Sequence, residues 1–466
     1  MSIGVLYPDS YAVEETFQLL KVPWEWYAPG RKYDVVIARR EDVPGYTGNL
    51  IDLATNDIFK TVGDLLNKGR PHLHEPACDI LLDSIRQELS KFTILAEIPP
   101  VPWDHPYMVA LTHDVDVTSV KECRFTTVGY AALRCIGQGN ILGGARFALS
   151  RWGMGNDPWD LFSRWEDLER SLNVRSTFFF IPRKGDPGVL GHPYRAARYD
   201  IPADIVRDLT RGGWEAGIHG IDNWTRSGRG STEINALGQE HKNCGNRTHW
   251  LISDAMSFRI LDEAGYSYDT TFGYNDDAGF RAGTTQVYRP RGAKNLLELP
   301  LHIQDLGLFG KSCRAPGAGG WKNTPCLDLS EDEAGHYCDR IFGFANRFGG
   351  VVTLLWHYEN IVPPRDWSAF YTELVKRAHA DGAWVTTAGQ VVDWFRVRRT
   401  TGIRVEVKEK KITIHITGLP EKQDRPVRVR LHIDPDRIAG TDAEHRPGSG
   451  YLDIAGCNPL ITVNLK

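Results

Sequence analysis

The amino-acid sequence predicts an α/β fold built on a barrel of parallel strands, with a small α/β domain before it and a small antiparallel β domain after it. Three observations lead to this prediction. Residues 1–100 mix short helical and strand patterns, residues 107–398 alternate apolar strands with helical stretches, and residues 400–466 change to a period of two. At 466 residues the chain is also too long for one ordinary domain.

The N-terminal part predicts a small α/β domain over residues 1–100. Helical patterns cover residues 12–20, 58–68 and 80–92, and YDVVIA (33–38) is typical of a short strand. The segment EIPPVPWDHP (97–106) carries four prolines, which makes it the best linker candidate. The next domain is therefore expected to begin at residue 101.

Residues 101–398 predict the barrel. Strand candidates include MVALTH, STFFFIP, WEAGIHG, RTHWLI, LLELPLHI, VVTLLWH and WVTT, with helical stretches such as RWEDLERSL, ADIVRDLTRG and AMSFRILDEAG between them. Repeated strand–helix units imply parallel strands with helical crossovers, and roughly seven or eight units indicate a closed or nearly closed barrel. Chemistry in such barrels lies at the carboxyl ends of the strands.

The last part, residues 399–466, predicts a β-sandwich-like domain. IRVEVKEKKITIHITG alternates apolar and polar residues, and VRVRLHI and LITVNL follow after breaks at Pro, Gly and Asp. This pattern is typical of short antiparallel strands with one buried face.

Composition limits the function classes. The formal net charge of -4 and the pI near 6.4 argue against a nucleic-acid partner or an acidic membrane surface. Eight scattered cysteines without paired spacing predict reduced thiols. The N-terminus shows no basic region followed by a long apolar stretch, and no apolar run approaches the roughly 20 residues of a membrane span. We therefore expect a cytoplasmic protein without a transmembrane segment.

The first strand of the predicted barrel ends on unusual charge. In MVALTHDVDVTSV (108–120) an apolar run leads into His113, Asp114 and Asp116. The two aspartates are two residues apart, so they share a face of an extended strand. Close carboxylates repel unless a cation lies beside them. A polar turn with an aspartate capping the next helix is the alternative.

Three further strand ends carry polar groups. WEAGIHGIDNW ends a strand at His219, NRTHWLI places Arg247 and His249 two residues apart, and VVTLLWHYEN leads into His357. Each histidine alone is explained as a hydrogen-bonded core residue, but together with the aspartates they predict one common site. A carboxylate and two imidazoles with an open position are typical of hydrolytic mononuclear metal sites.

The motifs THDVD, HGIDNW, NRTHW and LLWH occur in the order and spacing of the NodB-homology polysaccharide deacetylases, carbohydrate esterase family 4, which this sequence resembles over about residues 105–395. The resemblance implies a distorted (β/α)7 barrel and metal-dependent removal of acetyl groups from N- or O-acetylated sugars. It implies Asp114 as the catalytic base and Asp116 and His219 as metal ligands. It also implies Arg247 as the residue that orients the base and His357 as the general acid.

The second motif departs from the family pattern, because Asn223 stands where the family usually has another metal-binding histidine. An amide oxygen is a poor substitute on such a metal. We expect Asp116, His219 and His249 as the ligands, with Asp222 as the competing third ligand. The cofactor is expected to be one divalent metal ion, with zinc as the first choice and cobalt, nickel or iron as alternatives. A decayed metal site is the opposing interpretation.

Other residues are candidates for binding substrate. Trp250, Tyr274 and Trp356 flank the predicted site and are candidates to stack on sugar rings, with core packing as the alternative. Arg281 lies in the glycine-flanked loop GFRAGT, where it would contact a substrate carboxylate or phosphate unless it is an ordinary turn residue. Asp305, which ends LLELPLHIQD, either lines the mouth or caps a helix.

The sequence as a whole predicts a metal-dependent hydrolase that acts on carbon–nitrogen bonds other than peptide bonds. Its expected partner is an N-acetylated saccharide, and a lipid-linked or nucleotide-linked sugar would suit a cytoplasmic enzyme. One alternative is a non-catalytic carbohydrate-binding protein on a decayed deacetylase barrel. Another is a structural role in which the flanking domains bind partners.

Overall fold

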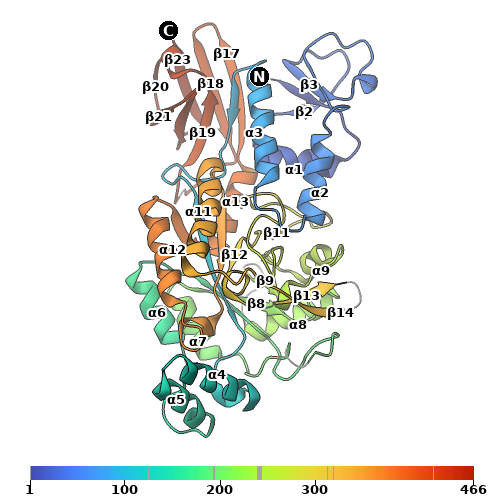
Figure 1. The fold of residues 1–466 in the computed structure, drawn as a ribbon. Coiled ribbons are helices and arrows are strands. Elements are labelled where there is room, and N and C mark those ends of the chain that lie inside the picture. The colour runs from blue at the N-terminus through green and yellow to red at the C-terminus, as the bar shows by residue number, and fades with distance from the viewer. Residues whose placement is uncertain are drawn as a thin grey trace.

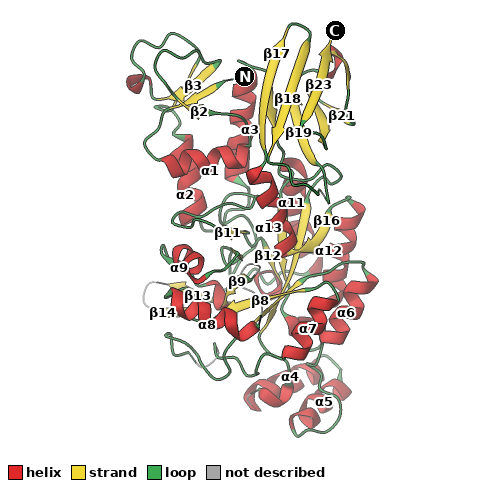
Figure 2. Cartoon of the chain, turned by 180° about the vertical axis from the view of Figure 1, so that it is seen from behind, coloured by secondary structure: helices red, strands yellow, loops and turns green. Residues whose placement is uncertain are grey.

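The computed structural model describes residues 2–123, 125–192, 195–238, 244–311, 313–317, 320–422 and 424–466, with only the backbone path for 313–317 and 320–324. The N-terminal and C-terminal sheets lie at one end of the molecule, and helices α4 and α5 lie at the opposite end (Figures 1 and 2). The parallel sheet of the central part lies between these two ends.

The N-terminal part is a parallel four-stranded sheet in the order β2-β1-β3-β4. The side chain of Asp9 caps the first helix by accepting from the Ala12 N–H, and Lys21 ends that helix in the left-handed conformation. Its elements are β1 (Ile3–Val5), α1 (Ser10–Leu20), β2 (Glu25–Trp26), β3 (Val35–Ala38), β4 (Leu50–Asp52), α2 (Ile58–Lys68) and α3 (Ala77–Ser90).

Nine described strands form the central sheet, and all its pairings are parallel. The main path runs β11-β10-β9-β8-β7-β6-β15-β12, with β16 also paired to β6. The strands are β6 (Met108–Val115), β7 (Thr177–Phe180), β8 (Glu215–Gly220), β9 (Gly245–Thr248), β10 (Tyr268–Asp269), β11 (Leu297–Glu298), β12 (Ile303–Gln304), β15 (Val351–Leu355) and β16 (Trp384–Thr387).

The central sheet curls toward a barrel. Its two end strands, β11 and β12, are joined by residues 299–302 alone, and a link this short spans at most about 17 Å. The ends of the sheet therefore lie near each other, as the predicted distorted barrel requires. Strand β6 is central, because its first half pairs with β16 and its second half with β7.

Amphipathic helices cover this sheet. The longest, α11, begins with a capping box between Ser330 and Glu333 and ends at Gly349 in the left-handed conformation. The helices are α6 (Phe162–Ser171), α7 (Ala203–Arg211), α8 (Ser227–Leu237), α9 (Ser257–Ala264), α10 (Asp305–Phe309), α11 (Glu331–Phe348), α12 (Ser368–Ala380) and α13 (Ala388–Thr400), and a hairpin of β13 (Cys313–Gly317) and β14 (Gly320–Thr324) precedes α11.

Helices α4 (Phe125–Gly137) and α5 (Ile141–Arg151) are among those that were not predicted from the sequence. They form a hairpin between β6 and α6, in the stretch where the sequence analysis proposes no element. Apolar residues occupy both the buried and the exposed faces of these helices, so the amphipathic period that identifies a surface helix is masked.

The C-terminal part consists of two antiparallel sheets, in the orders β17-β18-β23-β20 and β21-β22-β19-β5. Residues of both sheets share one apolar core, which gives a sandwich. Its strands are β5 (Leu95–Glu97), β17 (Gly402–Lys408), β18 (Lys411–Thr417), β19 (Val427–His432), β20 (Ile438–Thr441), β21 (His445–Gly448), β22 (Tyr451–Gly456) and β23 (Leu460–Leu465). Strand β5 joins this sandwich from before the barrel, and the boundaries at residues 100 and 398 stay predictions.

One cysteine differs from the prediction that all the thiols are reduced. Cys326 is disulfide-bonded, so the expectation of eight reduced thiols is wrong. Spacing along the chain does not report which thiols meet in space, which is why the pattern gave no signal. Where the structure describes the side chain, the free thiols are Cys78, Cys123, Cys135, Cys244, Cys338 and Cys457. Among the described residues, no helix has the length and apolar character that crossing a membrane needs.

Candidate active site

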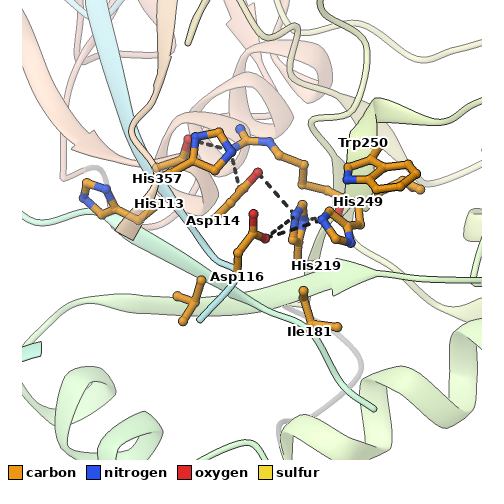
Figure 3. A network of polar contacts seen from close by, with 12 residues as sticks. His113, Asp114, Asp116, Ile181, His219, His249, Trp250 and His357 are labelled. Atoms are coloured by element: carbon orange, nitrogen blue, oxygen red, sulfur yellow. Dashed lines mark hydrogen bonds and ion pairs between the residues drawn. The ribbon is translucent and has the colours of Figure 1, made fainter. Parts of the chain in front are cut away.

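Two aspartates lie at the carboxyl end of β6. Asp114 is buried, and its Oδ1 accepts a hydrogen bond from Arg247 Nη1 at 3.0 Å. The Arg247 guanidinium is itself fully buried and held by Thr112 Oγ1 at 2.8 Å and by the Thr270 carbonyl at 3.1 Å. Asp116 follows β6 and points into the same space, as Figure 3 shows. The arginine therefore fixes the orientation of Asp114.

Two histidines approach Asp116 from neighbouring strands. His219 lies near the end of β8 and His249 directly after β9, and their Nε2 atoms are 3.4 Å and 3.6 Å from Asp116 Oδ1 (Figure 3). Nδ1 of His219 donates to the Arg247 carbonyl at 2.8 Å, and Nδ1 of His249 donates to the Arg195 carbonyl at 3.2 Å. Because a carbonyl only accepts, each Nδ1 carries a hydrogen, and each Nε2 faces the aspartate.

These three side chains fit a metal ion. One ligand atom from each of Asp116, His219 and His249 lies within 4.8 Å of the others. Asp116 Oδ1 and His219 Nε2 are buried and make no hydrogen bond among the described residues, which is costly unless another group satisfies them. A set of two imidazoles and one carboxylate suits zinc and neighbouring divalent metals.

The protonation states agree with a ligand role. Burial lowers the pKa of His249 to about 3, so its imidazole is neutral at pH 7, the form that binds metal. Burial alone would raise the pKa of Asp116, but the positive charge that His249 carries when it is protonated at low pH holds that pKa well below its usual range. Asp116 is therefore a carboxylate.

The competing ligands point elsewhere. Asp222 Oδ1 accepts from the Val189 N–H at 3.0 Å, and Asn223 Nδ2 donates to Tyr266 Oη at 3.1 Å. Both side chains are buried in the loop that follows β8. Local hydrogen bonds use Asp222 Oδ1 and Asn223 Nδ2, whereas Asn223 Oδ1 makes none among the described residues. The structure thus brings His249, and neither Asp222 nor Asn223, to Asp116.

His357 lies across the site on the chain that leaves β15. Its Nδ1 bonds to Asp305 Oδ1 at 2.7 Å, and its backbone N–H donates to Asp305 Oδ2 at 2.8 Å. Burial lowers the pKa of His357, but the charge and hydrogen bond of Asp305 outweigh it and raise the pKa to about 10. His357 is therefore an imidazolium at neutral pH.

The site opens into two adjoining cavities. The first, of about 200 Å³, is lined by Asp114, Asp116, His219, His249, Trp250, Leu251, Asn275, Gln304, Leu306, Leu355 and His357. The second, of about 190 Å³, shares Asp116, His249 and Trp250 with it and extends to Cys123, Thr127 and Glu359. Burial raises the pKa of Glu359 to about 7. Trp250, at φ 68°, stands between the two cavities on backbone that a non-glycine residue adopts at a cost.

The residues expected to bind substrate lie in three different places in the structure. Trp250 lines the site, whereas Tyr274 and Arg281 line a neighbouring cavity of about 310 Å³ that shares Leu251 and Asn275 with the first. Trp356 is fully buried and stacks on Phe370 in the core, so it offers no surface to a substrate. The core-packing alternative therefore describes Trp356, because its indole fills space between the sheet and α12.

Some supporting residues were missed by the sequence analysis. Thr112 lies two residues before Asp114 on β6, and its hydroxyl accepts from the same guanidinium that holds Asp114. The period of two along the strand was the signal that could have identified it. The carbonyl of Arg195 and the carboxyl of Glu359 left no such signal, because only the fold brings them to the site.

Comparisons with known proteins add structural likenesses. No protein-family model matches the chain, and no curated protein matches its sequence. Among solved structures, it is similar to a Mycobacterium smegmatis protein assigned as a polysaccharide deacetylase (19% identity, 68% of this chain and 100% of that one, TM-score 0.42). It is also similar to Puue allantoinase (12%, 64% and 93%, TM-score 0.40) and to the carbohydrate deacetylase Agd3 (10%, 100% and 98%, TM-score 0.36).

Polysaccharide and carbohydrate deacetylases are thus among the solved structures that this chain resembles. All these likenesses have TM-scores below 0.5, so function is inferred from the side chains of the site.

Proposed function

We propose that the protein is a metal-dependent hydrolase that removes the acetyl group from an N-acetylated saccharide. One observation supports this proposal most: the carboxylate and two imidazoles of Asp116, His219 and His249 lie within 4.8 Å of one another in the cavity that Asp114 and His357 also line. A metal-ligand set, a carboxylate and an imidazolium are the groups that amide hydrolysis needs.

The reaction begins with water. A divalent ion held by the three ligands would lower the pKa of a water molecule and polarise the acetyl carbonyl. Arg247 occupies Oδ1 of Asp114, while Oδ2 lies 3.5 Å from His219 Nε2 on the side of the ligands. Asp114 Oδ2 is therefore the atom placed to accept the proton of the attacking water.

The reaction ends with protonation of the amine. Because Asp305 holds Nδ1 of His357, the Nε2–H of the imidazolium is left for the leaving nitrogen of the sugar. Asp305 is in turn fixed by Asn360, whose Nδ2 donates to Asp305 Oδ2 at 2.7 Å. His357 thus acts as the general acid.

The first experiment measures acetate release from N-acetylated saccharides by the zinc-loaded protein. Asp114→Asn keeps the size of the side chain but removes the base, so we expect the rate to fall by about 10²–10⁴-fold. Metal content of the variant, measured by elemental analysis, should equal that of the wild type. Unchanged turnover would remove the proposed base, and a zinc-loaded wild type without acetate release would favour the carbohydrate-binding alternative.

The second experiment tests the ligand set. His249→Ala removes one of three ligands, so we expect zinc affinity to fall by at least about 100-fold. Asp222→Asn is the matched control, and it should bind zinc as the wild type does. Calorimetric titration with zinc, and with cobalt, nickel and iron, gives both values and the preferred ion. Full occupancy in His249→Ala, or loss in Asp222→Asn, would contradict the assignment.

We retain a cytoplasmic location as a prediction. The disulfide at Cys326 weighs against it, because disulfides persist mainly in oxidising compartments. Cell fractionation with an antibody to the protein would decide the location.

A further inference from the structure

The hairpin of α4 and α5 carries an unusual amount of exposed apolar surface. Of the fourteen exposed large hydrophobic side chains among the described residues, nine lie between residues 125 and 154. Leu142 is 84% exposed and Trp152 72%, although large apolar side chains are usually buried. The nine are Phe125, Tyr130, Leu133, Ile136, Ile141, Leu142, Leu149, Trp152 and Met154.

These side chains follow the helices rather than occurring singly. In α4, Tyr130, Leu133 and Ile136 recur every three residues, and in α5 Leu142 and Leu149 are two turns apart. The opposite faces of both helices, which include Val128, Ala131 and Cys135 on α4 and Gly144 and Phe147 on α5, are buried. The hairpin is therefore packed on one side and apolar on the other. Exposed apolar side chains concentrated on one element point to an interaction site.

The charge of this hairpin differs from that of the whole chain. Residues 125–156 contain Arg134, Arg146 and Arg151 and no acidic residue, while the chain carries a formal charge of -4. Arg146 donates to the Asn156 carbonyl at 3.3 Å, and Arg151 lies over the Phe125 ring at 4.3 Å. Among the described residues, no carboxylate pairs with these guanidinium groups. The net charge of the whole chain argued against binding to an acidic membrane. The α4–α5 hairpin by itself, however, is cationic and apolar.

We propose that the α4–α5 hairpin docks on the surface of an anionic lipid bilayer. An apolar helical face with Leu and Trp, flanked by arginines, is the arrangement that lies in a membrane interface. Arginine stems cover apolar surface while their charged ends reach the lipid phosphates, and Tyr and Trp suit the boundary. A second copy fits less well, because a two-fold contact would oppose the same uncompensated arginines.

The position of the hairpin indicates which kind of substrate a docked protein would reach. It lies at the end of the molecule away from the N- and C-terminal sheets (Figures 1 and 2). The cavity that contains Asp116 and His249 extends to Cys123 and to Thr127 of α4, at the base of the hairpin. If the proposed deacetylase function holds, the substrate is an acetylated saccharide carried on a membrane lipid, which the docked hairpin brings to the cavity.

The test is flotation of the full-length protein with vesicles. We expect binding to vesicles of phosphatidylcholine mixed with phosphatidylglycerol, weaker binding to phosphatidylcholine alone, and loss of binding as salt rises. Leu142→Asp should lower the partition coefficient at least about tenfold, and Arg146→Gln about fivefold. Leu460→Asp is the matched control, because Leu460 is a leucine 50% exposed on β23 of the other end, and it should bind as the wild type does.

Three results would overturn the docking proposal: no binding to anionic vesicles, equal binding by Leu142→Asp and the wild type, or a dimer in solution that the same substitution dissociates. Sedimentation velocity measures the last. Acetate release from a soluble saccharide should be unchanged in Leu142→Asp, since its side chain lies outside the catalytic cavity. Loss of vesicle binding with intact turnover therefore separates this proposal from the proposed function.

Discussion

At the scale of single residues, the partner of each histidine Nδ1 decides what the ring can do. Nδ1 of His219 and Nδ1 of His249 donate to backbone carbonyls, which leaves each Nε2 available to a metal ion. His357 bonds to the carboxylate of Asp305, which makes it a cation. His113, the second residue of the motif THDVD, bonds to a carbonyl and to the buried Glu169 and so belongs to the core.

The charge on His357 leads to a pH prediction. The pKa of His357 is raised to about 10, so under the proposed function its imidazolium acts as the acid below that pH, and we expect activity to be lost as pH rises through it. Asp305→Asn removes the charge that raises this pKa and leaves the burial that lowers it. We expect the alkaline limb of kcat to move to lower pH by about three pH units.

The measurement is kcat against pH with zinc content checked at each point. Asp381→Asn is the control, because Asp381 accepts a hydrogen bond from Tyr107 outside the cavity and should leave the profile unchanged. An alkaline limb that stays in place in Asp305→Asn would rule out His357 as the acid.

At the scale of elements, tight packing between strands positions the two histidines. A Cβ added to Gly245 on β9 would overlap the ring of Tyr268 on the next strand. That ring is fixed, because it is buried and its hydroxyl donates to Glu215 at 2.9 Å. Strands β8, β9 and β10 can therefore lie side by side only with a glycine at this position.

We expect Gly245→Ala to lower the free energy of unfolding by about 1–3 kcal/mol through this overlap. Gly343→Ala is the control, and we expect it to change the free energy of unfolding in the opposite direction. Gly343 lies inside α11 with no atom within 4 Å of an added Cβ, so alanine should stabilise by about 0.5–1 kcal/mol. Urea unfolding gives both values. A Gly245→Ala protein as stable as the wild type would show that β10 can move away.

The elements also show that His249 reaches Asp116 by a different route from the one predicted. From the sequence, Arg247 and His249 were expected on one face of a continuous strand. In the structure β9 ends at Thr248, and a short 3-10 turn with Trp250 at φ 68° follows. His249 faces Asp116 because of this turn, and a left-handed tryptophan has no sequence signature.

At the scale of the whole molecule, Arg398 joins three parts of the chain. It lies near the end of α13, fully buried, and donates to the carbonyls of Gln18 at 2.8 Å, Leu19 at 2.9 Å and Ile98 at 3.0 Å. The end of α1, the segment after β5 and the last helix of the barrel are thus tied by one guanidinium group. Burial lowers its pKa to about 9.

Arg398→Leu keeps apolar bulk but leaves these carbonyls buried without a donor. We therefore expect the free energy of unfolding to fall by about 3 kcal/mol. Arg404→Leu is the control, since the Arg404 side chain is 77% exposed on β17, and it should change stability by less than about 0.5 kcal/mol. Equal stability of the two variants in urea would mean that Arg398 does not join the parts.

The sequence by itself determined the α/β class, the helices and strands of most of the chain, and the candidate residues of the site. These features depend on periodicity and on charge at strand ends, both of which are local. Tertiary structure alone decided that His249 rather than Asp222 meets Asp116, that Trp356 belongs to the core, and that Cys326 is paired. It also decided that nine apolar side chains between residues 125 and 154 stay exposed. Those outcomes depend on which distant segments meet, and neither composition nor period records such contacts.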